Sequence, residues 1–192
     1  IAALDKSIKG MRIGFTPDFG IFPVEPEIAR MCEAAAKRFE DAGAIVEQAT
    51  FDFKRSAFEL SEAWDRMITI SGGLGTIEEF KAGGIDLLRD HADDLPDELI
   101  YWVEDAYKRG YIDFHDDEVI RTEVFDQIQG AFQDYDLLLS PTLACHPVKN
   151  DVNRNTVGPS TINGVKTEPL IGFCLTFFCN FTGNPAASIP GG

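Results

Sequence analysis

The chain has 192 residues, of which 44% are hydrophobic, and these include 15 Phe and 2 Trp. This length and apolar fraction suit one domain with a buried core, and 26% charged residues excludes a disordered chain. The 32 acidic residues outnumber the 17 basic ones and give a net charge of −15. Nucleic acids and anionic membranes bind proteins through Lys and Arg, so we expect neither as a partner.

The sequence also predicts a cytoplasmic location. No stretch reaches the roughly 18 to 20 apolar residues that a membrane span requires. The first ten residues lack the basic-then-apolar order of a secretory signal. Four cysteines without C-x-x-C spacing, in apolar surroundings, indicate reduced thiols: Cys32, Cys145, Cys174 and Cys179.

The first 46 residues predict a strand, a helix and a second strand. Residues 11–15 form a short apolar run that ends at Thr16-Pro17-Asp18. Pro26 suits the first turn of a helix, and Gly43 suits its left-handed end. Residues 44–46 follow as a strand. Such a unit places two parallel strands on either side of a right-handed crossover, which is typical of α/β proteins.

The middle of the chain is predicted to be helical. One helical face, marked by Leu60, Trp64, Met67 and Ser71, is expected to end at Gly72-Gly73. A helix over 77–88 is interrupted at Gly83-Gly84, and two longer helices follow over 96–109 and 113–132. Residues 135–139 then form a continuous apolar strand, as expected at the centre of a sheet, and stop at Ser140-Pro141-Thr142.

The last fifty residues predict less regular structure. The stretch 144–169 is a loop with a small hairpin that turns at Asn163-Gly164. Residues 170–178 are expected to form a short buried helix, and 186–189 a final strand. The predicted fold class is therefore α/β, with a mixed, mostly parallel central sheet flanked by several helices. Residues 1–192 are expected to form a single domain.

Several common functional motifs are missing from the sequence. His91, His115 and His146 lack metal-ligand spacing, so we predict no metal site and no cofactor. The glycine-rich stretch 71–75 has no following Lys-Ser/Thr and no preceding strand, which favours a helix end over a phosphate loop. Asn180-Phe181-Thr182 matches a glycosylation sequon, but the predicted location favours no modification.

Cys145 and His146 leave two interpretations open. They follow the strand at 135–139, at the carboxyl edge of the sheet, where open α/β sheets bind ligands. Cys145 is therefore either a nucleophile or a thiol in the wall of a pocket. Adjacent side chains diverge in an extended chain, which favours the pocket wall.

Two segments resemble the amidase-signature family. The strand 135–143 resembles the family's strand that ends in Pro-Thr, and 178–192 is similar to its Asn-x-Thr-Gly-x-Pro-Ala-x-Ser-x-Pro run. Residues 9–14 and 22–28 look like an earlier strand and helix start of the same family. The resemblance implies the amidase-signature fold and hydrolysis of linear amides through a Ser–cis-Ser–Lys triad and an acyl-enzyme.

The sequence departs from that family pattern in the catalytic residues. The Gly-Gly-Ser-Ser-Gly-Gly stretch and the motif with the catalytic lysine are missing, so none of the seven serines is predicted to be catalytic. The chain is therefore expected to be the C-terminal part of a bacterial amidase domain, truncated on both sides and inactive alone. Its expected partners are a small amide substrate and the remaining part of the amidase or a second subunit.

The resemblance and the sheet edge together predict a set of substrate-binding residues. These are Thr142, Leu143, Cys145, Phe177 and Asn180, with Trp64 as an outer candidate. An uncovered sheet border is expected near Ile13 or Ile189, which predicts aggregation or a homodimer. Two alternatives stay open: a free-standing small-ligand-binding α/β module, and, within the family, the amidotransferase subunit that acts on charged tRNA. The acidity and the lack of that subunit's Ala-Ser-Ser-Asn run disfavour the latter.

Overall fold

The computed structural model describes residues 6–152 and 156–191. Residues 1–5, half of the stretch that lacks the order of a secretory signal, lie outside the described residues. So does Gly192, the last residue of the family-like run, and so do residues 153–155 of the predicted loop. No helix in the two described ranges is long and apolar enough to cross a membrane.

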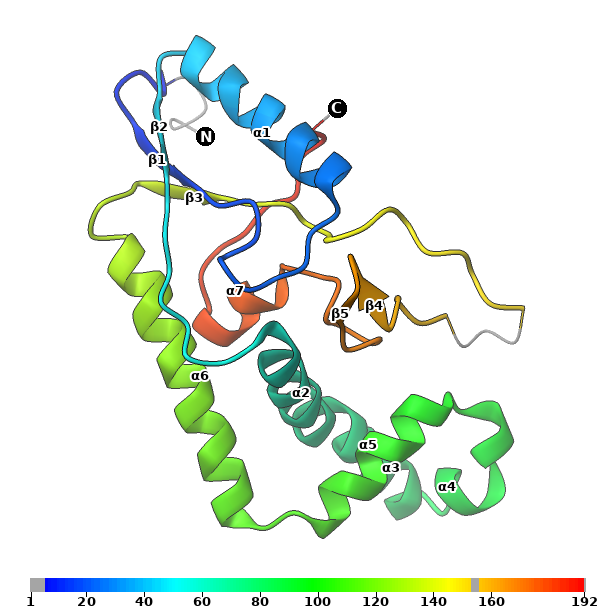
Figure 1. Cartoon of the computed structure of the whole chain (residues 1–192). Coiled ribbons are helices and arrows are strands. Elements are labelled where there is room, and N and C mark those ends of the chain that lie inside the picture. The colour runs from blue at the N-terminus through cyan, green and yellow to red at the C-terminus, as the bar shows by residue number, and fades with distance from the viewer. Residues whose placement is uncertain (1–5, 153–155, 192) are drawn as a thin grey trace.

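A three-stranded parallel sheet forms one side of the molecule (Figure 1). β1 (Arg12–Phe15) is the central strand, with β2 (Ile45–Gln48) on one side and β3 (Leu137–Leu139) on the other. Ile13 pairs in register with Val46 of β2 and with Leu137 of β3. The sheet thus combines the local β1–β2 unit with a strand from far along the chain, and the α/β prediction is confirmed.

Helix α1 (Pro26–Asp41) makes the crossover between β1 and β2. Pro26 lies in its first turn and Arg38 in its last, which suits the helix dipole, and Gly43 takes the left-handed conformation with φ of 94°. Gly14 in the central strand leaves room for Tyr135, because a Cβ there would lie 2.7 Å from that ring. The predicted start and stop signals of this unit are confirmed.

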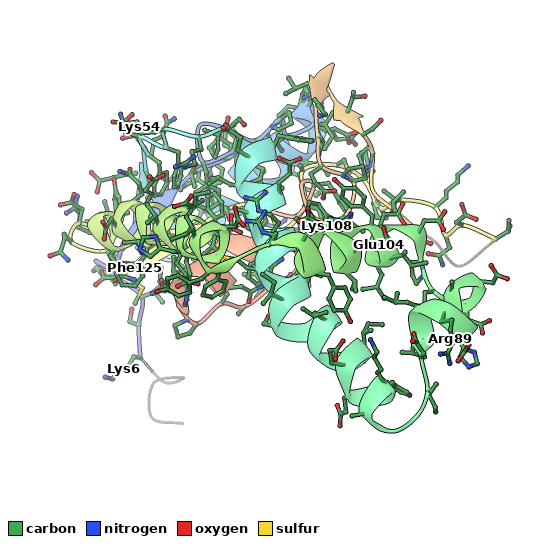
Figure 2. The ribbon with its side chains drawn as sticks, turned by 90° about the horizontal axis from the view of Figure 1, so that it is seen from below. Lys6, Lys54, Arg89, Glu104, Lys108 and Phe125 are labelled. Carbon is green, nitrogen blue, oxygen red and sulfur yellow. The ribbon has the colours of Figure 1, made fainter. Side chains whose placement is uncertain are left out.

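A group of helices makes up the rest of the molecule (Figure 1). α6 (Tyr111–Ala131) runs beside α2 (Ala57–Ile68), while α3 (Gly75–Ala82), α4 (Leu87–Asp90) and α5 (Asp97–Lys108) gather at the end remote from the sheet. The 3₁₀ turn Ala92–Asp94 connects α4 to α5. Seen from below, Arg89 on α4 and Glu104 and Lys108 on α5 lie on this outer part (Figure 2).

The predicted helix end at Gly72-Gly73 is wrong. A π-helical segment, Thr69–Leu74, joins α2 to α3 through these glycines. Its wider turn is supported by two hydroxyls that donate to backbone carbonyl oxygens: Thr69 to Asp65 at 2.6 Å and Ser71 to Met67 at 3.0 Å. Packing against α5 favours this path, since Gly73 lies against that helix.

The C-terminal part differs from its prediction at two places. Residues 170–175 form turns, and the short helix comes later as α7 (Phe177–Thr182). The expected strand at 186–189 is an extended segment outside any strand that the structure assigns to residues 156–191. A strand requires a partner for its backbone hydrogen bonds, and sequence alone does not show whether one is within reach. The hairpin of β4 (Thr161–Ile162) and β5 (Val165–Lys166) is confirmed.

Aromatic side chains fill the space between the sheet and the helices. α7 lies there and places three phenylalanines, each at most 2% exposed, against the inner faces of α2 and α6. Phe178 contacts Phe22, with their ring centroids 5.3 Å apart. Phe19 joins this cluster from a turn with φ of 51°, held by its backbone N–H donating to the Thr16 hydroxyl at 2.8 Å.

The expected sheet border does not lie at Ile13. Ile13 is only 1% exposed and belongs to the central strand, so it is not at a border. The outer strands are β2 and β3, and Leu137 of β3 is 47% exposed. Ile189, the other expected border residue, is 59% exposed. The uncovered apolar edge therefore lies along β3 and the C-terminal extended segment.

Candidate functional site

An apolar groove of about 620 Å³ opens at the carboxyl end of β3. One wall is the face of α1 that carries Met31 and Cys32, the second is the chain that leaves β3, and the third is the C-terminal extended segment. Together these walls contribute mostly aliphatic and thiol side chains: Ile28, Met31, Cys32, Leu143, Cys145 and Ile189. The size and lining suit a small apolar or aromatic ligand.

Few polar groups border the groove. The hydroxyl of Thr142, in the lining, lies 3.2 Å from the hydroxyl of Ser188 in the C-terminal extended segment. Near the start of α1, the backbone N–H of His146 donates to a Glu25 carboxylate oxygen at 3.1 Å. The His146 ring nitrogen Nε2 lies 3.2 Å from the Glu27 carboxylate. The polar side chains of the lining that could orient a ligand are therefore those of Arg38, Ser140, Thr142 and His146.

Backbone hydrogen bonds fix the wall that follows β3. The Thr142 carbonyl accepts from Leu175 N–H at 3.1 Å, and Ala144 N–H donates to the Phe173 carbonyl at 2.7 Å. On the other side, the Ala144 carbonyl accepts from Glu25 N–H at 2.7 Å. Residues 142–145 are thus held between the start of α1 and the turns at 173–175, which makes them a rigid lining.

The environment of Cys145 opposes the nucleophile interpretation. Its side chain is 5% exposed, and burial, followed by the charge of Glu25, raises the pKa of the thiol. Burial and then the charge of Cys145 raise the pKa of the nearby Cys174 to about 11. Catalytic cysteines require the opposite shift, because the thiolate is the nucleophile. This favours Cys145 as a thiol of the pocket wall.

The structure brings together three of the five predicted binding residues. Thr142, Leu143 and Cys145 line the groove. Phe177 is fully buried in the aromatic core, and Asn180 is exposed on α7; neither belongs to the groove lining. The outer candidate Trp64 packs on Phe177, with ring centroids 6.4 Å apart. Direct contact of any of these residues with a substrate stays a prediction.

Sequence reasoning missed the contribution of α1 and of Ser188. The helical spacing of Met31, Cys32 and Ala35 predicts an inward face, and such a face is ordinarily part of the core. In the structure this face lines the groove, and Met31 is 39% exposed. Ser188 belongs to the family-like run, and its position opposite Thr142 depends on the fold of the whole C-terminal segment. The sequence shows that α1 has an apolar face, but it does not show whether protein or a ligand covers that face.

Metal-binding clusters are absent from the described parts of the chain. Across residues 6–152 and 156–191, no three His, Cys, Asp or Glu side chains are grouped to hold an ion. The glycines at 72, 73 and 75 lie within helical segments rather than in a loop that could surround a phosphate. The described site is therefore an apolar groove whose lining also includes the polar side chains of Arg38, Ser140, Thr142 and His146.

Comparison with known proteins identifies the family. The model of the family named Amidase matches residues 1–192. An acylamidase of Rhodococcus erythropolis is 27% identical over all of this chain and 38% of its own length. The A subunit of the glutamyl-tRNA(Gln) amidotransferase of Lactiplantibacillus plantarum is 26% identical, over all of this chain and 40% of its own length.

A solved structure agrees with the fold in detail. The crystal structure of a bacterial aryl acylamidase of the amidase signature family superposes with a TM-score of 0.96 and 41% sequence identity. The alignment covers 100% of this chain and 39% of that protein. The chain thus spans about two fifths of the length of the relatives that it matches. On the family match over its whole length, this chain belongs to the amidase signature family.

Proposed function

We propose that this chain is the sheet scaffold and one wall of the substrate pocket of an enzyme that hydrolyses linear amides. The nucleophilic serine, its cis-serine partner and the lysine belong to polypeptide outside the chain, where they form and hydrolyse the acyl-enzyme. Within the chain, the groove beside β3 holds the apolar part of the amide, and the Thr142–Ser188 hydroxyl pair orients its polar end.

The observation that carries the proposal is the close match to an aryl acylamidase, at 41% identity and a TM-score of 0.96 over the whole chain. The groove supports it, because about 620 Å³ with an aliphatic lining fits an aryl or acyl group. The sequence also supports it, since the family's serine-rich catalytic stretch is missing from it. The proposed partners are a small amide substrate and the remaining part of the enzyme, in the cytoplasm.

The first test is an activity assay of the 192-residue chain on an aryl amide such as an anilide. We expect no hydrolysis above the buffer rate, because the chain has no serine–lysine pair of the family type. Hydrolysis at a rate proportional to the concentration of the chain would show that the scaffold proposal is wrong. Binding of the intact anilide without turnover would be measured in the same samples by calorimetry.

A second test places a substitution in the groove of the complete enzyme. Leu143→Ala should raise KM for an aryl amide about tenfold and change kcat less, because it removes apolar contact made by substrate and transition state alike. Val165→Ala, on the exposed face of β5 and outside the groove, is the matched control. An unchanged KM for the Leu143 variant would exclude this groove as the aryl site.

The alternative is a free-standing module that binds a small ligand. It predicts a monomeric chain that binds the anilide as tightly alone as in the complete enzyme. The scaffold proposal predicts that binding by the chain alone is weak, because only part of the pocket is present.

A further inference from the structure

Two buried carboxyl groups interact, one on α2 and one just before the turns that precede α7. Asp65, near the end of α2, is 4% exposed, and Glu168 is 6% exposed. Two ionised carboxylates buried side by side repel each other strongly, so burial of both favours a proton on one of them. Backbone hydrogen bonds fix the position of one of the two, Glu168.

The Glu168 side chain is held in place by the backbone. Its oxygen Oε2 accepts from the N–H groups of Leu170 at 2.7 Å and Ile171 at 2.8 Å. The turn is closed by Gly172 N–H, which donates to the Glu168 carbonyl at 2.9 Å. No larger residue fits at 172, because a Cβ there would lie 2.7 Å from the Glu168 backbone nitrogen and oxygen. Glu168 therefore forms the rigid half of the pair.

Asp65 has a different environment. Its oxygen Oδ2 is buried and has no hydrogen-bond partner among the described residues. Burial first, and then the interaction with Glu168, raise the pKa of Asp65 from its ordinary 3.8 to about 9. Glu62 on the same helix acts in the same direction.

The nearest cation does little to offset this. Arg66, beside Asp65, lowers the pKa of Asp65, but its guanidinium is bound to Asp117 of α6 at 2.6 Å. Arg109, at the end of α5, is bound to the same Asp117 at 2.7 Å. Arg66, Arg109 and Asp117 are thus paired with one another, and Glu168 remains the side chain that interacts with Asp65.

We propose that Asp65 keeps a proton at neutral pH and shares it with Glu168, and that loss of this proton at alkaline pH loosens the turns at 167–175. These turns hold the groove wall, since Phe173 and Leu175 make the backbone hydrogen bonds to Ala144 and Thr142. The pair is thus a pH-sensitive clamp between α2 and the groove. It does not depend on the proposed amide hydrolysis, because stability and local opening report it directly.

The direction of the pH dependence follows from linkage. Between pH 3.8 and about 9, the folded chain holds a proton on Asp65 that the unfolded chain has released. The stability contributed by Asp65 is therefore fully present below pH 3.8 and is lost as the pH rises to about 9. Asparagine offers Glu168 an N–H donor and has no proton to lose, so Asp65→Asn should remove this part of the pH dependence.

The experiment compares thermal unfolding of the purified wild type and Asp65→Asn from about pH 5 to about pH 9.5. We expect the unfolding midpoint of the variant to exceed that of the wild type by roughly 5 °C near pH 9, and by less near pH 5. Asp117→Asn is the matched control, because it changes a buried carboxylate that is bound to two arginines. It should lower the midpoint throughout.

A local readout tests the clamp itself. Cys174 lies in the clamped turns, so its labelling by iodoacetamide, located by peptide mass, reports their opening. Above about pH 9 the wild type should label several times faster than Asp65→Asn at the same pH, where the intrinsic reactivity of the thiol is equal. Equal midpoint slopes, a variant that is less stable or unfolded near pH 9, or equal labelling rates would each overturn the proposal.

Discussion

At the residue scale, the chain contains two buried aspartates whose partners differ in charge: arginines for Asp117 and a carboxyl group for Asp65. Asp117 is 2% exposed and binds Arg66 through both side-chain oxygens and Arg109 through one. Asp65 lies one position from Arg66 in the sequence, yet it faces a carboxylate. A buried charge is stabilised only by a partner of matching geometry, so neighbouring residues in the same protein can have different protonation behaviour.

Asp117 is therefore predicted to be essential for the contact of α2, α5 and α6. Asp117→Asn should lower the free energy of unfolding by about 3 kcal/mol, because two arginines lose their charged partner. Urea unfolding followed by circular dichroism measures this loss. Asp52→Asn is the control, since that carboxylate pairs with Lys54 but is 77% exposed, and its replacement should change stability by under about 0.5 kcal/mol.

The sequence predicted some candidate site residues and not others for a physical reason. Thr142, Leu143 and Cys145 directly follow a strand, and the carboxyl end of a strand fixes where the next residues lie. Phe177 and Asn180 depend on where α7 packs, which local patterns do not show. The Asp65–Glu168 pair joins residues that are distant in the sequence, so nothing in either neighbourhood indicated it.

At the element scale, capping and turn signals were reliable where they act locally. Pro26 and Gly43 set the limits of α1, and Asn163-Gly164 sets the β4–β5 turn with both residues at positive φ. Glycines at 72 and 73 were misleading, because the packing of α5 keeps them helical. The strand predicted at 186–189 fails for the same reason. A strand forms only where another segment lies close enough to share its backbone hydrogen bonds.

The glycines of the π-helical segment allow a direct test of this explanation. Gly72→Ala should raise the free energy of unfolding by roughly 0.5–1 kcal/mol, because the added Cβ meets no atom within 4 Å and alanine restricts the unfolded chain. Gly73→Ala should gain less or destabilise, since its Cβ would lie 3.3 Å from Leu99 of α5. Chemical denaturation of the two variants distinguishes them. A destabilised Gly72 variant would contradict the helical path of this segment.

At the scale of the whole molecule, the parallel sheet has one well-packed strand and two outer ones. The apolar edge along β3, with Leu137 47% and Ile189 59% exposed, lies beside the groove. An edge of this kind pairs readily with another chain. Family membership and fold class could be predicted from the sequence because both depend on motifs with fixed order. The open edge was predicted near Ile13 or Ile189; Ile13 instead lies in the central strand, whereas Ile189 is 59% exposed.

This edge predicts that the purified chain associates with itself. Leu137→Lys should shift the sedimentation profile toward the monomer, because a charge on an outer strand opposes edge pairing. Val152→Lys adds the same charge at a loop position that is 95% exposed and should change nothing. Identical association of the two variants would show that the β3 edge is not the contact.

The pairing of β1 with β3 also has a consequence for how the chain folds. Arg12 N–H donates to the Asp136 carboxylate, and the two residues are 124 positions apart in the sequence. This bond lies at the start of the β1–β3 pairing, in which Ile13 is in register with Leu137. Closing so long a loop has a large entropic cost, whereas β1, α1 and β2 are neighbours along the chain. During synthesis, β1 therefore lacks its β3 partner until the helices between Ala57 and Ala131, and then β3 itself, have been made.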